Sequence, residues 1–146
     1  MGLDTALLDL REYPMELFDG REYGEYDEVT TEAMRKLLDA ELYAITSPVY
    51  FGGIPGALKN LIDHIPYETF RERPRTAGLI ATGRDNRHQL VLDTQLRSTL
   101  VYLGVDVATT ATYVTEADFD EFELDSPPVE ARIETTVTET VALSGL

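Results

Sequence analysis

Three short apolar runs limit this chain to a narrow set of folds. They occupy residues 41–47 (ELYAITS), 76–82 (TAGLIAT) and 105–114 (VDVATTATYV), and none shows a strict alternation of apolar and polar residues. Runs of this kind are typical of strands that are covered on both faces, as in parallel sheets. Parallel strands need a crossover connection between them, and helical patterns separate the runs. The sequence therefore predicts an α/β fold with a parallel sheet.

Apolar residues at helical spacing mark four helices, over residues 30–39, 55–65, 92–103 and 127–141. The first has Thr30 or Thr31 as its predicted N-cap. The last opens at a Pro-Pro pair and carries its apolar residues at four-residue spacing, at Val129, Ile133, Val137 and Val141. Residues 3–10 (LDTALLDL) are interpreted as a short strand ahead of the first helix. The predicted order is β-α-β-α-β-α-β-α in a single domain, 1–146, because the acidic loop 115–126 is too short to divide it.

The charge excludes one class of partner. The chain has 27 acidic and 12 basic residues, a formal net charge of −15. It lacks the basic patch that a nucleic-acid surface requires. The acidic residues are spread along the chain, and Lys36 and Lys59 are its only lysines. This composition favours a halophilic source, in which salt screens the self-repulsion, with a merely acidic protein as the alternative.

Missing residue types exclude further chemistry. The chain has no cysteine, which rules out disulfides, thiol catalysis and zinc-thiolate sites. His64 and His88 are too few for a histidine-rich metal cluster, so no metal site is predicted. No apolar run approaches the roughly 18 residues that span a bilayer. No basic amino-terminal region precedes an apolar stretch, so we expect a cytoplasmic protein without a membrane partner.

The most distinctive stretch, residues 46–63 (TSPVYFGGIPGALKNLID), lies where a strand ends and a helix begins. Ligands of parallel sheets bind beyond the carboxyl ends of the strands. Tyr50 and Phe51 can flank a flat ring, while Gly52 and Gly53 let the backbone approach a ligand closely. Free N–H groups of the turn and helix start can bind acceptor atoms. The residue types leave two interpretations open: a site for a planar aromatic cofactor, or a tight turn whose aromatic side chains pack on the next helix.

This stretch resembles the NAD(P)H-dependent FMN reductase family, whose pattern is close to T-P-x-Y-N-x-S-x-P-x-x-L-K-N-x-x-D. The corresponding residues here are Ser47, Pro48, Tyr50, Phe51, Gly53, Pro55, Leu58, Lys59, Asn60 and Asp63. Residues 7–18 and 76–104 also resemble parts of the family. The resemblance implies a flavodoxin-like parallel sheet with crossover helices, and FMN and NAD(P)H as cofactors. It further implies an oxidoreductase that passes hydride to a small-molecule electron acceptor, such as a flavin, quinone, azo dye or metal oxyanion.

The resemblance also implies which residues bind the flavin. The residues placed against the isoalloxazine ring are Pro48, Val49, Tyr50, Phe51, Gly52 and Gly53. The second wall consists of Gly83, Arg84 and Asp85. Phe51 stands where the family has Asn, and the loop 82–88 is bulkier and more charged than the family's. Arg84 or Arg87 is a candidate partner for a cofactor phosphate, with a solvated charged loop as the alternative. No catalytic residue is predicted, because the cofactor carries the hydride chemistry, and Asp63 and His64 are interpreted as structural.

One part of the family pattern is not found. The family opens with a strand, a G-S-x-R-x-x-S-type loop that cradles the FMN phosphate, and a helix, whereas residues 3–10 correspond to its second strand. Without this first β-α unit, only the last helix covers one face of the sheet. We therefore expect residues upstream or a second chain to supply the cover, the latter as a homo-oligomer (dimer or tetramer). The predicted function is an FMN reductase; the alternative is a flavodoxin-like remnant without a productive FMN site, acting as a binding or assembly subunit. A one-electron flavodoxin carrier fits the motif less well.

Overall fold

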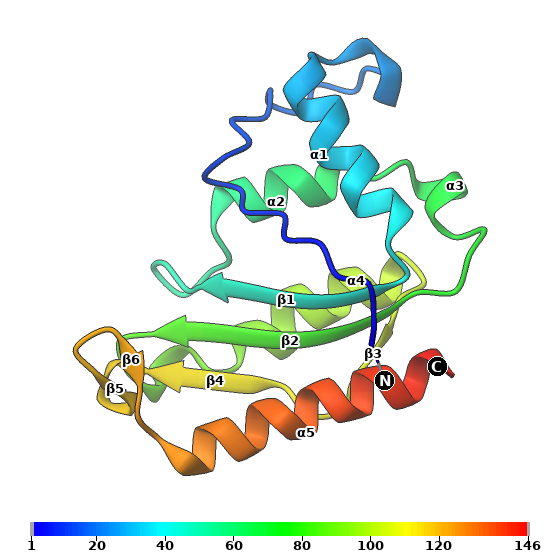
Figure 1. Ribbon diagram of the computed structural model, residues 1–146. Helices are drawn as coiled ribbons and strands as arrows, with labels where there is room; N and C mark the ends of the chain where they lie inside the picture. Colours follow the sequence, from blue (N-terminus) through cyan, green and yellow to red (C-terminus); the bar gives the residue numbers. More distant parts are fainter. Residues whose placement is uncertain (1, 146) are drawn as a thin grey trace.

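A parallel sheet forms the centre of the computed structural model, which describes residues 2–145 (Figure 1). Its strands are β1 (Leu42–Pro48), β2 (Thr76–Gly83), β3 (Asp106–Val107) and β4 (Thr112–Thr115). The central strand β2 pairs in parallel with β1 on one side and with both β3 and β4 on the other. The predicted parallel α/β architecture is confirmed, and the carboxyl ends of β1 and β2 lie side by side.

The helices follow the predicted order. They are α1 (Glu28–Asp39), α2 (Gly56–Asp63), α3 (Tyr67–Phe70), α4 (Ser98–Tyr102) and α5 (Pro127–Ser144). A π-helical segment, η3 (Leu92–Arg97), runs directly into α4. The short elements are the 3-10 turns η1 (Tyr23–Glu25), η2 (Asn86–His88) and η4 (Glu116–Asp118) and the hairpin β5 (Phe119–Asp120) and β6 (Glu123–Leu124). No helix within residues 2–145 is long and apolar enough to cross a membrane.

The two faces of the sheet are covered unequally. On one face Ala77, Leu79 and Ala81 belong to a buried cluster that includes residues from α1, α2, η3 and α4. On the other face, α5 is the only helix of the described residues that packs against the sheet (Figure 1). Its side chains of Thr136 and Thr140 lie over Gly78. The expectation that a single helix covers this face is confirmed.

The prediction for α5 is confirmed in its start at Pro127 but wrong in its buried face. The fully buried side chains are Thr136 and Thr140, whereas Val137 is 44% exposed. Each step of four residues turns the helix by about 40° beyond a full turn, because the helix has 3.6 residues per turn. A stripe at strict four-residue spacing therefore drifts around the helix. The face on the sheet corrects for this drift with one three-residue step, from Ile133 to Thr136, before the four-residue step to Thr140.

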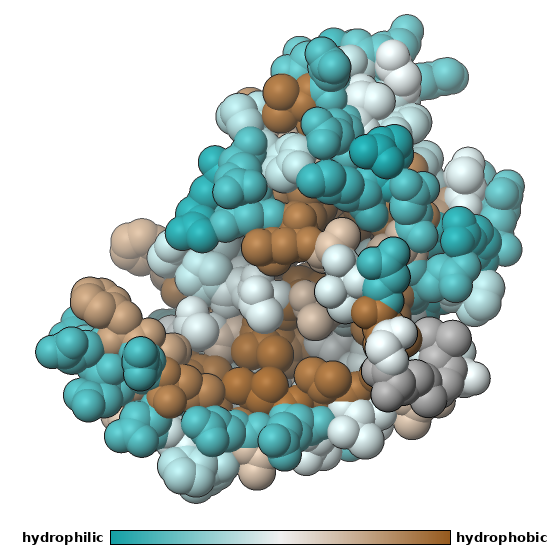
Figure 2. Space-filling view, viewed as in Figure 1, coloured by the Kyte–Doolittle hydropathy of each residue, from teal (hydrophilic) through white to brown (hydrophobic). Residues whose placement is uncertain are grey.

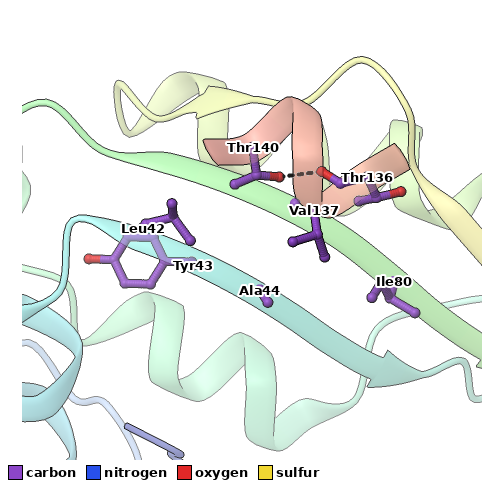
Figure 3. Close-up of a pocket in the computed structure, with 8 residues that line it drawn as sticks. Leu42, Tyr43, Ala44, Ile80, Thr136, Val137 and Thr140 are labelled. Atoms are coloured by element: carbon purple, nitrogen blue, oxygen red, sulfur yellow. Dashed lines mark hydrogen bonds between the residues drawn. The ribbon is translucent and has the colours of Figure 1, made fainter. Parts of the chain in front are cut away.

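A hollow opens on this side because α5 leaves part of β1 uncovered. Its lining includes Leu42, Ala44, Ile80 and Val137, whose side chains lie between the sheet and the helix in Figure 3. Figure 2 shows apolar side chains gathered on the same side, above α5. Ala44 and Thr46 are exposed, so the prediction that both faces of this strand are covered is wrong for β1. For β2 it is largely confirmed.

Two predicted strands differ from the structure. Residues 2–9 form no strand, because no other strand forms backbone hydrogen bonds with this segment. Residues 2–7 are exposed. The run 105–114 is split into β3 and β4. Arg97 donates hydrogen bonds to the carbonyls of Ala108 (2.7 Å) and Thr109 (3.1 Å) at the break. Glu139 accepts one from the backbone N–H of Thr110 at 2.7 Å.

Two helix starts also differ slightly. The N-cap of α1 is Asp27, not Thr30 or Thr31: its carboxylate accepts a hydrogen bond from the backbone N–H of Thr30 at 2.8 Å. Pro55 is the N-cap residue of α2 and not its first helical residue. The helix therefore begins at Gly56, one residue later than predicted.

Candidate ligand-binding site

The two predicted loops meet at the carboxyl ends of β1 and β2. The residue after β1, Val49, still pairs with β2: its N–H donates a hydrogen bond to the carbonyl of Thr82 at 2.8 Å. The Val49 side chain packs against the core, so it anchors the loop that follows. The loop after β2 starts at Gly83. This edge is where parallel sheets bind ligands.

A tight two-residue turn follows Val49. Tyr50 and Gly53 exchange both backbone hydrogen bonds, each 3.0 Å long. Between them Phe51 has φ +50° and Gly52 has φ +76°, so both central residues adopt the left-handed conformation of a type I′ turn. Glycine adopts this conformation freely, but Phe51 does not, and its presence there indicates a turn that its surroundings hold in place.

The turn offers free groups to a ligand. Within residues 2–145, no hydrogen-bond partner is found for the backbone N–H of Phe51 or of Gly52. The side chain of Phe51 is fully exposed and that of Tyr50 is 61% exposed. The turn is tight, as one of the two sequence interpretations requires, but these side chains are not buried against α2. Two adjacent N–H donors beside two exposed aromatic rings can receive the polar edge and the face of a flat ligand.

The charges of the second loop are largely matched within the loop. Asp85 accepts a side-chain hydrogen bond from Arg87 at 2.5 Å and another from the Arg87 backbone N–H at 3.0 Å. These bonds hold the pKa of Asp85 far below its usual range. The Arg84 side chain is 88% exposed and lies 3.9 Å from Glu116. The predicted residues Gly83, Arg84 and Asp85 therefore do lie at the end of β2, but Arg87 faces a carboxylate of its own loop.

Gly83 is required by its neighbour on β4. A β-carbon at this position would lie 1.9 Å from the hydroxyl oxygen of Tyr113. That hydroxyl is buried and has no hydrogen-bond partner among the described residues. Burial is the main cause that raises the pKa of Tyr113, and the negative charge of Asp85 adds to it. The glycine thus allows a phenol ring to lie directly under the second loop.

Sequence reasoning missed two residues that contact the turn. Gln95, on the π-helical segment η3, donates from Nε2 to the carbonyl of Gly52 and accepts at Oε1 from the N–H of Ile54, both at 3.1 Å. The ring of His88 lies beside Gly52, where an added β-carbon would be 3.4 Å from Nδ1. The Gln95 contact leaves no local signal, because Gln95 is more than 40 residues from the turn in sequence and no motif contains it. His88 lies in the second loop, but its residue type alone does not indicate that its ring reaches Gly52.

The helical part of the motif serves another purpose. The side chain of Asn60 donates to the carbonyl of Glu16 and accepts from the N–H of Phe18, both at 2.9 Å. His64, only 5% exposed, has Nε2 2.9 Å from the same Glu16 carbonyl. Asp63 pairs with Lys59 along α2. These residues hold the segment before α1 onto α2, in agreement with the structural role predicted for His64. The described residues contain no cluster of three or more His, Asp or Glu that could hold a metal ion.

Comparison with known proteins identifies the class. Residues 1–120 match the family described as NADPH-dependent FMN reductase, and the chain belongs to this family. It is 34% identical over 140 residues to an NAD(P)H-dependent FAD/FMN reductase of Geobacillus thermodenitrificans, covering 95% of this chain and 75% of the relative. It is 39% identical over 106 residues to an FMN reductase (NADPH) of Pseudomonas aeruginosa, covering 73% of this chain and 56% of the relative.

Solved structures confirm the predicted flavodoxin-like fold. An oxidoreductase from Corynebacterium diphtheriae superposes with a TM-score of 0.68 at 24% identity, over 81% of this chain and 63% of the other. An NADH:FMN oxidoreductase in its apo form gives a TM-score of 0.64 at 22% identity, over 76% of this chain and 58% of the other. The chain thus spans less than two thirds of each of these two structures.

Proposed function

We propose that this chain is the ring-binding part of an NAD(P)H-dependent FMN reductase. In this proposal residues 48–53 lie against the isoalloxazine ring of FMN and residues 83–85 form the second wall. The single observation that carries it is the left-handed turn at Phe51 and Gly52, which leaves two adjacent N–H donors free at the carboxyl end of β1. Membership of the family supplies the reaction class.

In this mechanism the chain's own residues bind the flavin ring and orient it. The N–H groups of Phe51 and Gly52 donate to acceptor atoms on the polar edge of the ring, and the rings of Tyr50 and Phe51 exclude water from its face. The chemistry that bound FMN would supply is hydride transfer from a nicotinamide to a small acceptor such as a flavin or quinone. No side chain needs to transfer a proton. Asp85 holds none, because its bonds to Arg87 keep it ionised.

The residues fit the ring of FMN better than its phosphate. A phosphate dianion needs several N–H donors or unpaired cations. Arg87 is paired with Asp85, and Arg84 lies near Glu116. No glycine-rich loop of the expected type occurs in the sequence. The second candidate function is a flavodoxin-like subunit that binds or assembles without a productive FMN site, and the observation that favours it is the pairing of Arg84 and Arg87 with carboxylates.

We further propose that the chain works as a homo-oligomer, a dimer or tetramer. The outer edge of β1 has no paired strand among the described residues, and the hollow beside α5 exposes apolar side chains of Ala44 and Val137. Native proteins usually cover or otherwise protect the edge strands of a sheet, and large apolar patches are uncommon on monomers. A second chain that covered them would remove both from water.

Titration with FMN and with riboflavin, followed by fluorescence quenching in high salt, separates these functions. Riboflavin has the same ring and no phosphate. If the chain supplies only the ring site, both ligands bind with similar, weak affinity. Each charge-assisted phosphate bond is worth roughly 1.5 to 3 kcal/mol, so a phosphate site elsewhere in the chain would make FMN bind orders of magnitude more tightly. Absence of binding by both ligands, with the fold intact, would reject the reductase and support the assembly subunit. Light scattering on the same samples tests the oligomer.

A further inference from the structure

Gln95 joins the candidate turn to the core of the protein. It lies on the π-helical segment η3, whose neighbouring residues Leu92 and Leu96 are buried in the main cluster. Its amide reaches the carbonyl of Gly52 and the N–H of Ile54, the groups on either side of Gly53. Irregular π segments often occur at functional sites.

We propose that Gln95 is a positioning residue of the ring site: it holds the 50–53 turn so that the N–H groups of Phe51 and Gly52 face the ligand. This inference rests on the proposed function. The left-handed conformations of Phe51 and Gly52 are sparsely populated and persist only where the surroundings fix them. The hairpin bonds between Tyr50 and Gly53 close the turn, but they do not tie it to another element. Among the described residues, Gln95 is the side chain whose hydrogen bonds tie the turn to another element.

The chemistry of the contact requires an amide. The carbonyl of Gly52 can only accept a hydrogen bond, and the N–H of Ile54 can only donate one. A side chain that satisfies both must carry a donor and an acceptor side by side, as the carboxamide of Gln95 does. A carboxylate has two acceptors and would face the Gly52 carbonyl with negative charge. A protonated carboxylic acid again offers one donor and one acceptor.

This difference makes the role testable through pH. In Gln95→Glu the clamp is broken while the carboxyl is ionised and restored when it is protonated. The Gly52 carbonyl stabilises only the protonated form, and the partial burial of position 95 disfavours the charged one, so both act to raise the pKa of the introduced group above its usual value of about 4.3; the N–H of Ile54 acts in the opposite direction. We expect riboflavin affinity of this variant to fall roughly tenfold at pH 8 and to recover towards pH 5. The recovery is read as the difference between this variant and the wild-type protein at each pH, because the ring of His88 also lies beside the turn.

Two further variants complete the experiment. Gln95→Leu removes both bonds at similar volume, and its affinity should stay low at every pH. Gln89→Glu, on an exposed residue of the neighbouring loop, adds the same charge without touching the turn and should bind as the wild type does. Amide hydrogen exchange of the ligand-free proteins gives a second readout: exchange at Ile54 should rise roughly tenfold in Gln95→Leu and, at high pH, in Gln95→Glu.

Wild-type affinity and unchanged Ile54 exchange in Gln95→Leu would overturn the inference. A pH profile of Gln95→Glu that matches Gln89→Glu would do so as well, and this comparison serves even if Gln95→Leu does not fold. If the wild-type protein binds no flavin, the proposed function fails. The exchange measurement then still decides whether Gln95 holds the turn.

Discussion

A β-carbon on Gly78 would lie 2.4 Å from the hydroxyl oxygen of Thr140, so α5 packs directly on the backbone of β2. Thr140 is 2% exposed and donates to the carbonyl of Thr136 within the helix at 2.6 Å. Thr136 also forms a hydrogen bond with Thr112 on β4 at 2.9 Å. This face of the sheet is therefore held by small residues and buried hydroxyls, with little of the apolar packing found on the other face.

Gly78→Ala should destabilise the protein by about 1–3 kcal/mol, because the new methyl group has no room unless α5 moves away from the sheet. Urea unfolding in high salt measures this cost. Gly24→Ala is the matched control, since a β-carbon there would meet no atom within 4 Å and the backbone angle is ordinary. Equal unfolding midpoints for the two variants would show that α5 does not pack as closely as described.

Gly52→Ala tests the left-handed turn. The φ angle of +76° costs a residue with a β-carbon roughly 1–2 kcal/mol, and the methyl group would also contact His88. Gly53→Ala should cost less, because its φ is not in the left-handed region and its nearest contact is an ordinary 3.5 Å. We expect riboflavin affinity to fall more in the first variant than in the second. The reverse order would mean that the turn changes conformation when ligand binds.

Much of the fold could be predicted because its signals are local. The apolar runs of β1 and β2 and the Pro-Pro start of α5 each depend on neighbouring residues. The pairing of strands, in contrast, depends on residues that are distant in sequence. Residues 3–10 have the composition of a strand, yet form none, since a strand exists only when another strand lies beside it.

The candidate site likewise has a part that local sequence signals locate and a part that depends on residues distant in sequence. The turn after β1 could be located from its two glycines and two aromatic residues. The residues that hold it could not, because Gln95 comes from a helix more than 40 residues later and reaches the turn only after the sheet has formed. The break between β3 and β4 has the same origin, since Arg97 and Glu139 approach it from two different helices.

Asp27 should make part of the stability depend on acid pH. Its bonds to Thr30 lower the pKa of this N-cap carboxyl in the folded state below its value of 3.8 in the unfolded chain. The stabilisation is therefore fully present above the unfolded pKa and is lost as pH falls through the folded one. We expect Asp27→Ala to melt at a lower temperature than the wild type at pH 7, with a smaller difference near pH 3.

The control for this measurement is Asp4→Ala, which removes the same charge from an exposed residue outside any helix. Its melting temperature should stay close to that of the wild type at both values of pH. A difference for Asp27→Ala that is constant between pH 7 and pH 3 would mean that ionisation of Asp27 contributes nothing to the cap.

Salt should stabilise the folded chain, in line with the predicted halophilic source. The net charge of −15 repels itself in the compact state, and the screening length falls from about 30 Å at 0.01 M salt to about 3 Å at 1 M. Salt also weakens exposed ion pairs such as Arg73–Glu41, but such pairs contribute little. We therefore expect the melting temperature to rise steadily from low to molar KCl.

The triple variant Asp4→Asn, Glu72→Gln, Glu134→Gln removes three exposed negative charges and should show a smaller rise. A flat or falling melting temperature in the wild type would contradict the halophilic interpretation, and equal slopes for the two proteins would assign the rise to a salt effect other than charge screening.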